Sequence, residues 1–259
     1  MKKFIPAIVA AVLVFGSCST LNYNYLMQGG TQALQAASIT DDQIKEYVAQ
    51  YVTQLDAQNT VLPESNAYVK RLRKLTSGLT SVDGTPLNFK VYKTNDVNAF
   101  ACADGSVRVY TGLMDLMNDN EVLGVIGHEI GHVALKHTKK QMQSAILTSA
   151  AMTGLASTGE TMAALTQSQL GAIGEAVMSA KFSRKHESQA DDFAYDFLKG
   201  AGKNPVCLMQ GFEKLQSLEK ASSSTNTELV NNLFSSHPAT ADRIKKIHKK
   251  LLADGYVKE

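Results

Sequence analysis

The residues best suited to chemistry are His128, Glu129 and His132, which form a His-Glu-x-x-His pattern. Apolar residues at helical spacing flank them, so we expect a helix, on which histidines four apart lie one above the other. Both imidazoles can then reach one metal ion, and zinc is the default because it accepts neutral imidazoles. Glu129 would lie beside the ion, where its carboxylate can take a proton from an attacking water. The pattern predicts metal-assisted hydrolysis, because unpaired histidines among apolar neighbours would be costly to bury.

Two histidines leave a third metal ligand to be found. An extended pattern would place it six residues after the second histidine, but that position holds Thr138. His137 is one position out and faces elsewhere on a continuous helix, so we expect it to be structural or solvated. Glu187 is the better candidate, because Asp191 lies one turn further on the same face and can accept a hydrogen bond from a ligating histidine. His186 is a weaker rival, since its position faces about 100° away.

The elements that would position these residues follow from local patterns. A capping box at Thr40 and Gln43 predicts one helix, and a second is expected from residue 63 to residue 78. Alternating apolar residues around 87–91, 97–101 and 107–109 predict strands, with Asp104-Gly105 as a hairpin turn. From residue 111 onward the pattern predicts mainly helices. Asp119 or Asn120 is expected to cap the helix that contains the His-Glu-x-x-His string, and a later helix over residues 183–199 is expected to carry Glu187. We therefore expect one α+β domain that is mainly helical with a small sheet.

The helical stretch over residues 141–180 leaves two interpretations open. It is rich in small residues, with breaks around Gly154 and Gly159. Loosely packed helices joined by a flexible loop explain this composition, and so does a mobile lid or a membrane-touching hairpin.

Three motifs together resemble zinc metallopeptidase family 48, which includes the CAAX prenyl proteases and the HtpX-like proteases. They are the His-Glu-x-x-His string, Glu-x-x-Ala-Asp starting at Glu187, and Ser-His-Pro-x-x-x-x-Arg, which contains His237 and Arg243. The likeness covers residues 60–250. It implies a zincin-type α+β domain with a small antiparallel or mixed sheet whose edge strand borders the active site. It also implies one Zn²⁺ held by His128, His132 and Glu187, with Glu129 as the general base.

The resemblance extends to residues around the metal. It implies that residues 97–101 form the edge strand that receives substrate, with Asn98, Ala99 and Phe100 in contact with it; from the sequence, an ordinary internal strand is an equal alternative. His237 would lie near the metal, where it either hydrogen-bonds the oxyanion or occupies the open zinc position and keeps the enzyme latent. Arg243 is a candidate orienting group beside Asp191.

The first residues have the pattern of a targeting signal rather than of a folded element. Lys2 and Lys3 precede a short apolar run and small residues that end at Cys18. The segment resembles a bacterial lipoprotein signal, although Phe15 stands where leucine is usual, and a simple cleaved signal is the alternative. We expect residues 1–17 to be the signal, residues 18–39 to be the lipidated cysteine and tether, and residues 40–259 to be the protease domain. Ser19 stands where aspartate usually marks inner-membrane retention, which favours the outer membrane.

Composition narrows the function classes. The 259 residues are 44% hydrophobic and 19% charged, which excludes a disordered chain. Lys2 and Lys3 account for the formal net charge of +2, so a cleaved chain would be neutral and gives no sign of nucleic-acid binding. With Cys18 reserved for lipid, Cys102 and Cys207 are left as a candidate disulfide, with free thiols as the even alternative.

These observations predict a zinc endopeptidase of the bacterial cell envelope, lipid-anchored to the outer membrane and facing the periplasm. Its expected substrates are unfolded or misassembled envelope proteins, with the outer-membrane assembly machinery as a partner. The alternative is a non-proteolytic holdase or assembly factor that uses the sheet edge and has a latent zinc site. A membrane-embedded protease is disfavoured because the longest apolar run falls short of roughly 20 residues.

Overall fold

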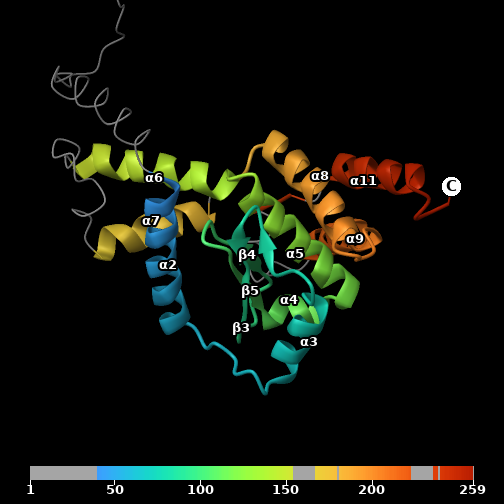
Figure 1. The fold of residues 1–259 in the computed structure, drawn as a ribbon, viewed down its shortest axis with the longest axis horizontal. Helices are drawn as coiled ribbons and strands as arrows, with labels where there is room; N and C mark the ends of the chain where they lie inside the picture. Colours follow the sequence, from blue (N-terminus) through green and yellow to red (C-terminus); the bar gives the residue numbers. More distant parts are fainter. Residues whose placement is uncertain (1–39, 154–166, 180, 223–235, 239, 259) are drawn as a thin grey trace, which may run out of the picture.

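The computed structural model of the protein describes residues 40–153, 167–179, 181–222, 236–238 and 240–258 (Figure 1). The expected signal, Cys18 and the tether lie outside these residues and stay predictions. So does the expected loop between the two helices of the 141–180 stretch. No helix in the described ranges is long and apolar enough to cross a membrane.

The first helices follow their capping signals. Helix α2 (Asp41–Gln58) opens with the predicted capping box, in which the side chains of Thr40 and Gln43 each accept the other residue's backbone N–H. Helix α3 (Ala67–Leu75) is shorter than the predicted range, because Asn66 caps its first turn by accepting the N–H of Tyr68. An asparagine side chain that satisfies a free N–H fixes the helix start.

The strands form one small mixed sheet and a separate hairpin. The sheet contains β3 (Asn88–Tyr92), β4 (Ala99–Ala101) and β5 (Ser106–Tyr110), and its order is β3-β5-β4. Strand β5 is parallel to β3 and antiparallel to β4, so β4 lies at an edge. The hairpin pairs β1 (Ser81–Val82) with β2 (Thr85–Pro86). The mixed sheet with an edge strand is as predicted, although β4 is shorter than residues 97–101.

The predicted Asp104-Gly105 turn joins β4 to β5. Gly105 has a φ of 86°, and its N–H donates to the carbonyl of Cys102 at 2.9 Å. A Cβ at this position would lie 2.0 Å from the carbonyl oxygen of Pro86, so only glycine fits both the dihedral angle and the space.

The two faces of the sheet carry different apolar clusters, because side chains alternate along a strand. Val91, Val107 and Val109 join the larger cluster with α5, α8, α9 and α11. Tyr92 and Phe100 belong to a second cluster with residues of α2, α6 and α7. In Figure 1 the sheet accordingly lies between α2 and α7 on one side and α5 on the other.

The remaining helices surround α5, the helix of the His-Glu-x-x-His string. Asn118 caps α5, one residue earlier than predicted, and forms a capping box with Glu121. Ser183 caps the helix that carries Glu187. In chain order these helices are α4 (Thr111–Leu116), α5 (Asp119–Ala134), α6 (His137–Thr153), α7 (Gln167–Ser179), α8 (Arg184–Gly200), α9 (Val206–Ser222) and α11 (Ala241–Ala253).

The disulfide proposed for Cys102 and Cys207 is not formed. Both residues are buried free thiols. Cys102 belongs to the second cluster against α2, whereas Cys207 lies in the larger cluster at the start of α9. Burial raises the pKa of the Cys207 thiol to about 12, so it behaves as an apolar core residue.

A buried ion pair fastens α2 to the sheet. The Arg108 side chain on β5 is 2% exposed and donates two hydrogen bonds to Asp56 of α2, at 2.8 and 3.0 Å. Tyr92 and Lys90 donate to the same carboxylate at 2.6 and 2.7 Å. Burial alone would raise the pKa of Asp56, but these hydrogen bonds outweigh it and lower the pKa to about 2.

We predict that Asp56→Asn lowers the free energy of unfolding by about 3 kcal/mol, because the Arg108 charge loses its buried partner. The contribution of Asp56 is present above its ordinary pKa of 3.8 and is lost as the pH falls towards 2. Urea unfolding of both proteins between pH 2 and pH 7 measures this, and the gap should narrow in acid. Glu64→Gln, at an exposed ion pair, is the control and should leave stability unchanged. A wild-type protein with flat stability over this acid range would contradict the prediction.

Candidate active site

Helix α5 brings His128, Glu129 and His132 into the interior, where their exposed fractions are 2%, 4% and 0%. The helix is buried along most of its length, between the sheet and helices α8 and α9. The carboxylate of Glu129 has one oxygen, Oε1, that is buried without a hydrogen-bond partner. A buried unsatisfied carboxylate oxygen is costly, so this site is built to meet a polar group from outside the chain.

Glycines on α5 allow the neighbouring helices to approach closely. A Cβ on Gly131 would lie 2.6 Å from the carbonyl oxygen of Ala190 on α8. A Cβ on Gly124 would lie 2.1 Å from the carbonyl oxygen of Cys207 on α9. Because α8 carries Glu187, the close approach at Gly131 sets the distance between this carboxylate and the histidines of α5.

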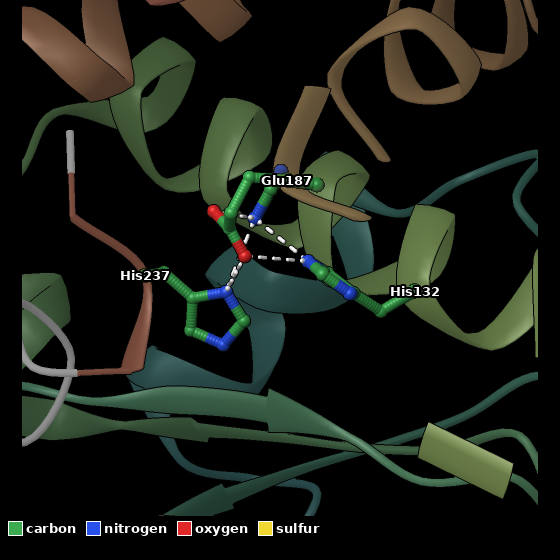
Figure 2. Close-up of side chains that lie close together, drawn as sticks. His132, Glu187 and His237 are labelled. Carbon is green, nitrogen blue, oxygen red and sulfur yellow. Dashed lines mark hydrogen bonds and ion pairs between the residues drawn. The ribbon is translucent and has the colours of Figure 1, made fainter. Parts of the chain in front are cut away.

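Four side chains converge on one point: His128, His132, Glu187 and His237, which we call the donor set. Figure 2 shows His132, Glu187 and His237 reaching this point from three separate segments. The Nε2 atoms of His128 and His132 are 3.1 Å apart, and that of His132 lies 3.2 Å from Glu187 Oε1. The Nδ1 atom of His237 lies 3.2 Å from His128 Nε2 and 3.1 Å from Glu187 Oε1.

These four separations are close to those of a tetrahedral metal site, and all four donor atoms lie within 4.8 Å of one another. With metal–ligand bonds of about 2.0 Å, tetrahedral donor atoms lie roughly 3.3 Å apart. The buried charges also favour a metal site. Three buried carboxylates, those of Glu129, Glu187 and Asp191, face one buried guanidinium, that of Arg243. A divalent cation would compensate the excess of negative charge. The residues therefore fit zinc by donor type, spacing and charge.

The pKa shifts reflect this acidic, desolvated environment. Burial alone would lower the pKa of His128, but Glu187 and Asp191 outweigh it and raise the pKa to about 9. Burial lowers the pKa of His132 to about 2, which keeps this imidazole neutral. Burial alone would raise the pKa of Glu187, but the neighbouring imidazoles hold it well below the usual range. The donor set thus offers an ionised carboxylate in a place that favours positive charge.

Asp191 and Arg243 lie directly behind the donor set. Asp191 Oδ1 is 3.0 Å from His128 Nδ1, the geometry expected of a group that orients a ligating histidine. Arg243 on α11 donates to both oxygens of Asp191 at 2.8 and 2.7 Å, and its Nη1 lies 2.6 Å from Glu187 Oε2. The guanidinium also lies over the Phe212 ring at 4.3 Å. This packing ties α11 to both acidic residues of α8.

A pocket runs from the donor set along the edge strand β4. Its lining includes Asn98, Ala99 and Phe100, together with Glu129 and His237. The other walls come from helices α2, α6 and α7 through Val48, Tyr51, Met142 and Val177. The structure therefore brings the expected substrate-contacting residues and the expected base to one pocket.

The structure excludes the solvated alternative for His137 and contradicts the expectation that it faces away from His132. We expected a structural or solvated group, but His137 is 2% exposed and its Nδ1 lies 3.2 Å from His132 Nδ1. Phe182 was not predicted either, and its ring lies 3.9 Å from that of His132. Its place just before the Ser183 helix cap was the available signal. His186 does not join the donor set; it stacks on His137 at 4.3 Å.

Among hydrolases, a carboxylate held between a metal-binding cluster and the edge strand of a sheet is the arrangement of a metallopeptidase. The model of Peptidase family M48 matches residues 63–251, and the chain belongs to this family. Its members are zinc-dependent metalloproteases, and this chain is one of them, with proteins as its substrates.

Two relatives match almost end to end. The chain is 42% identical to "Metalloprotease LoiP" of Escherichia coli (strain K12), over 98% of each chain. It is 39% identical to "Metalloprotease YcaL" of the same strain, over 96% of this chain and 97% of that protein. The "Beta-barrel assembly-enhancing protease" of that strain is 26% identical over 86% of this chain, which spans 48% of that longer protein.

We predict that Gly131→Ala separates α5 from α8 and weakens zinc binding severalfold, with a loss of about 1–3 kcal/mol in unfolding free energy from overpacking. Competition with a chelating dye measures the affinity, and urea unfolding measures the stability. Gly171→Ala on α7 is the matched control, because its Cβ would meet nothing within 4 Å. The control should keep zinc affinity and gain about 0.5–1 kcal/mol. Equal behaviour of the two variants would contradict this account of the packing.

Proposed function

We propose that the protein is a zinc endopeptidase of the bacterial cell envelope that degrades unfolded or misassembled periplasmic and outer-membrane proteins. The observation that carries this proposal is the position of Glu129. Its Oε1 atom, which has no hydrogen-bond partner, is buried in the pocket that β4 and the donor set share. A peptide lying along β4 would pass this carboxylate, which is where hydrolysis needs a base.

Strand addition to β4 explains how substrate would bind. The backbones of Asn98 and Cys102 hydrogen-bond to β5, so by alternation those of Ala99 and Ala101 point away from β5. The Asn98 side chain accepts the Ala99 N–H at 2.9 Å, so an incoming peptide would have to displace it. An extended peptide that does so can pair with these outward groups through its own backbone, which gives affinity with little sequence preference. The apolar walls contributed by Val48 and Met142 suit chains that expose core residues. Both features favour unfolded substrates.

The proposed chemistry divides between the metal and the chain. Zinc held by His128, His132 and Glu187 would polarise the scissile carbonyl and acidify the attacking water. Glu129 accepts the proton from that water and passes it to the leaving amine. Asp191 holds the His128 ring in register by accepting from its Nδ1–H. Arg243 fixes the carboxylates of Asp191 and Glu187 against their mutual repulsion.

In this proposal His237 blocks the site and keeps the enzyme latent, and we call it a latch for that reason. Its Nδ1 atom takes the fourth corner of the donor set, and its Nε2 atom lies 3.7 Å from Glu129 Oε1. A ring in this place fills the space between the base and the cluster, where water and the scissile carbonyl must enter. This favours the latent form of the two roles that the sequence left open.

The envelope location rests on the first residues and on one relative. Residues 1–17 have the pattern of a secretory signal, and Cys18 is the proposed lipid attachment site, with Ser19 favouring the outer membrane. The name of the β-barrel assembly-enhancing relative supports a link to outer-membrane assembly, and hence to the assembly machinery as a partner. A periplasm-facing lipoprotein would meet misassembled chains there.

One observation favours the second candidate, a holdase or assembly factor with a latent zinc site. Structural zinc sites are closed by four protein ligands, and the donor set contains four side chains. A purely structural site, however, has no use for the buried carboxylate of Glu129 beside it. Proteolysis therefore remains the better proposal.

We predict that Glu129→Gln retains bound zinc but loses proteolysis of a denatured protein by about a hundredfold or more, because a carboxamide cannot accept the proton. Zinc content and cleavage of unfolded casein are the two measurements. Glu213→Gln, an exposed residue on α9, should match the wild type in both. Undiminished cleavage by Glu129→Gln would reject the proposal in favour of the holdase.

We predict that His237→Ala raises the basal cleavage rate severalfold, because it removes the group that fills the site. His248→Ala on α11 is the control and should leave the rate unchanged. If His237→Ala instead loses cleavage while keeping zinc, His237 assists the oxyanion and is not a latch.

A further inference from the structure

His137 lies behind the donor set and belongs to none of the roles described so far. It is the first residue of α6, and its side chain is buried against both α5 and α8. Its Nδ1 atom is 3.2 Å from Nδ1 of His132, a hydrogen-bond distance between two ring nitrogens.

The direction of this hydrogen bond follows from the other side of the His132 ring. Nε2 of His132 faces the donor set, at 3.1 Å from His128 Nε2 and 3.2 Å from Glu187 Oε1. A neutral imidazole that offers Nε2 to a metal carries its proton on Nδ1. His132 Nδ1–H is therefore the donor, and Nδ1 of His137 must be the unprotonated acceptor.

We propose that His137 is a positioning residue for the zinc centre: it accepts the Nδ1–H of His132 and so fixes the tautomer and the orientation of that ligand. The inference rests on the proposed zinc site and adds to it a second orienting group. Asp191 does the same for His128, at 3.0 Å from its Nδ1. Each histidine of the His-Glu-x-x-His string then has its own acceptor behind it, a carboxylate for one and a neutral imidazole for the other.

His137 is itself held by α8. Its ring stacks on His186 at 4.3 Å with an interplanar angle of 19°, and its side chain hydrogen-bonds to Gln189. These two residues flank Glu187 on the same helix. His137 thus connects a ligand of α5 to the helix that carries the Glu187 ligand, and both ligands share one support.

A left-handed turn brings His137 into this position. Five residues along a continuous helix correspond to a rotation of about 140°, which would turn His137 away from His132. Lys136 lies two residues after the last residue of α5 and has a φ of 57°, which breaks the helical path. Helix α6 therefore starts in a new direction, with His137 facing back. A non-glycine residue in this conformation costs about 1 kcal/mol, a cost that the buried contacts of His137 offset.

Three substitutions at position 137 separate a hydrogen-bonding role from a packing role. In His137→Asn, Oδ1 occupies about the place of Nδ1 and can still accept, whereas His137→Leu fills the space without an acceptor. We expect zinc affinity to fall 10–100-fold in His137→Leu, the usual effect of removing such a partner, and to stay within about threefold of wild type in His137→Asn. In His137→Gln the side-chain oxygen lies near the place of Nε2 and cannot replace Nδ1 as the acceptor. The zinc affinity of this variant should therefore resemble that of His137→Leu.

The readouts are zinc affinity by dye competition and the visible absorption spectrum of the cobalt-substituted protein, neither of which needs a substrate. His248→Leu on α11 controls for loss of a histidine and should match the wild type. If His137→Leu binds zinc as tightly as the wild type, or if His137→Asn loses as much as His137→Leu, the proposal is wrong. Failure of the protease proposal would appear in the Glu129→Gln assay instead.

A measurement on the wild-type protein covers the case in which a variant does not fold. In zinc-loaded protein with ¹⁵N-labelled histidine, Nδ1 of His132 should show the shift of a protonated ring nitrogen and Nδ1 of His137 that of an unprotonated one. A protonated Nδ1 on His137 would overturn the proposal.

Discussion

The structure depends on negative charge buried between α5, α8 and α11. Glu129, Glu187 and Asp191 are each at most 4% exposed, and Arg243 is the guanidinium that faces them. Buried charge without compensation is among the most destabilising features a core can have, so a bound cation would stabilise this arrangement. We therefore expect metal binding to stabilise the fold, and the helices that carry the carboxylates must be held at a fixed separation to bind the metal. The glycine contact between α5 and α8 meets that requirement.

The opposite face of the sheet also contains buried charge, but there the ion pair is complete within the chain. Arg108 and Asp56 bury a bidentate ion pair that attaches α2 to β5. Because Val48 and Tyr51 of α2 line the pocket along β4, this pair also fixes one wall of the proposed substrate site. The edge strand thus lies between two regions of buried charge, one that is neutralised within the chain and one that the metal neutralises.

Local patterns predicted the parts of the site that lie on one helix, because helical spacing determines which of their side chains share a face. Residues four apart share a helix face, which is why His128 and His132 converge and why Glu187 and Asp191 both face α5. Spacing failed at His137, since it assumes a continuous helix and the left-handed Lys136 breaks it. Spacing also cannot say which distant residues meet. Cys102 and Cys207 were paired by elimination, yet they lie in different apolar clusters.

The His237 ring occupies the space beside Glu129 that the reactants of the proposed hydrolysis would need. The His237 ring presents Nδ1 to the donor set and Nε2 to Glu129, so it spans the region in which water and a peptide carbonyl would react. Substrate entry must therefore displace this ring, and the displaced donor would be replaced by the substrate oxygen or by water at the same corner. With zinc bound by His128, His132 and Glu187, the incoming oxygen would take the place that the His237 ring leaves, so opening need not cost a full metal–ligand bond. A strand edge that accepts peptides with little sequence preference gains selectivity from this step, because only a chain that binds well enough along β4 can compensate for the lost His237 contacts.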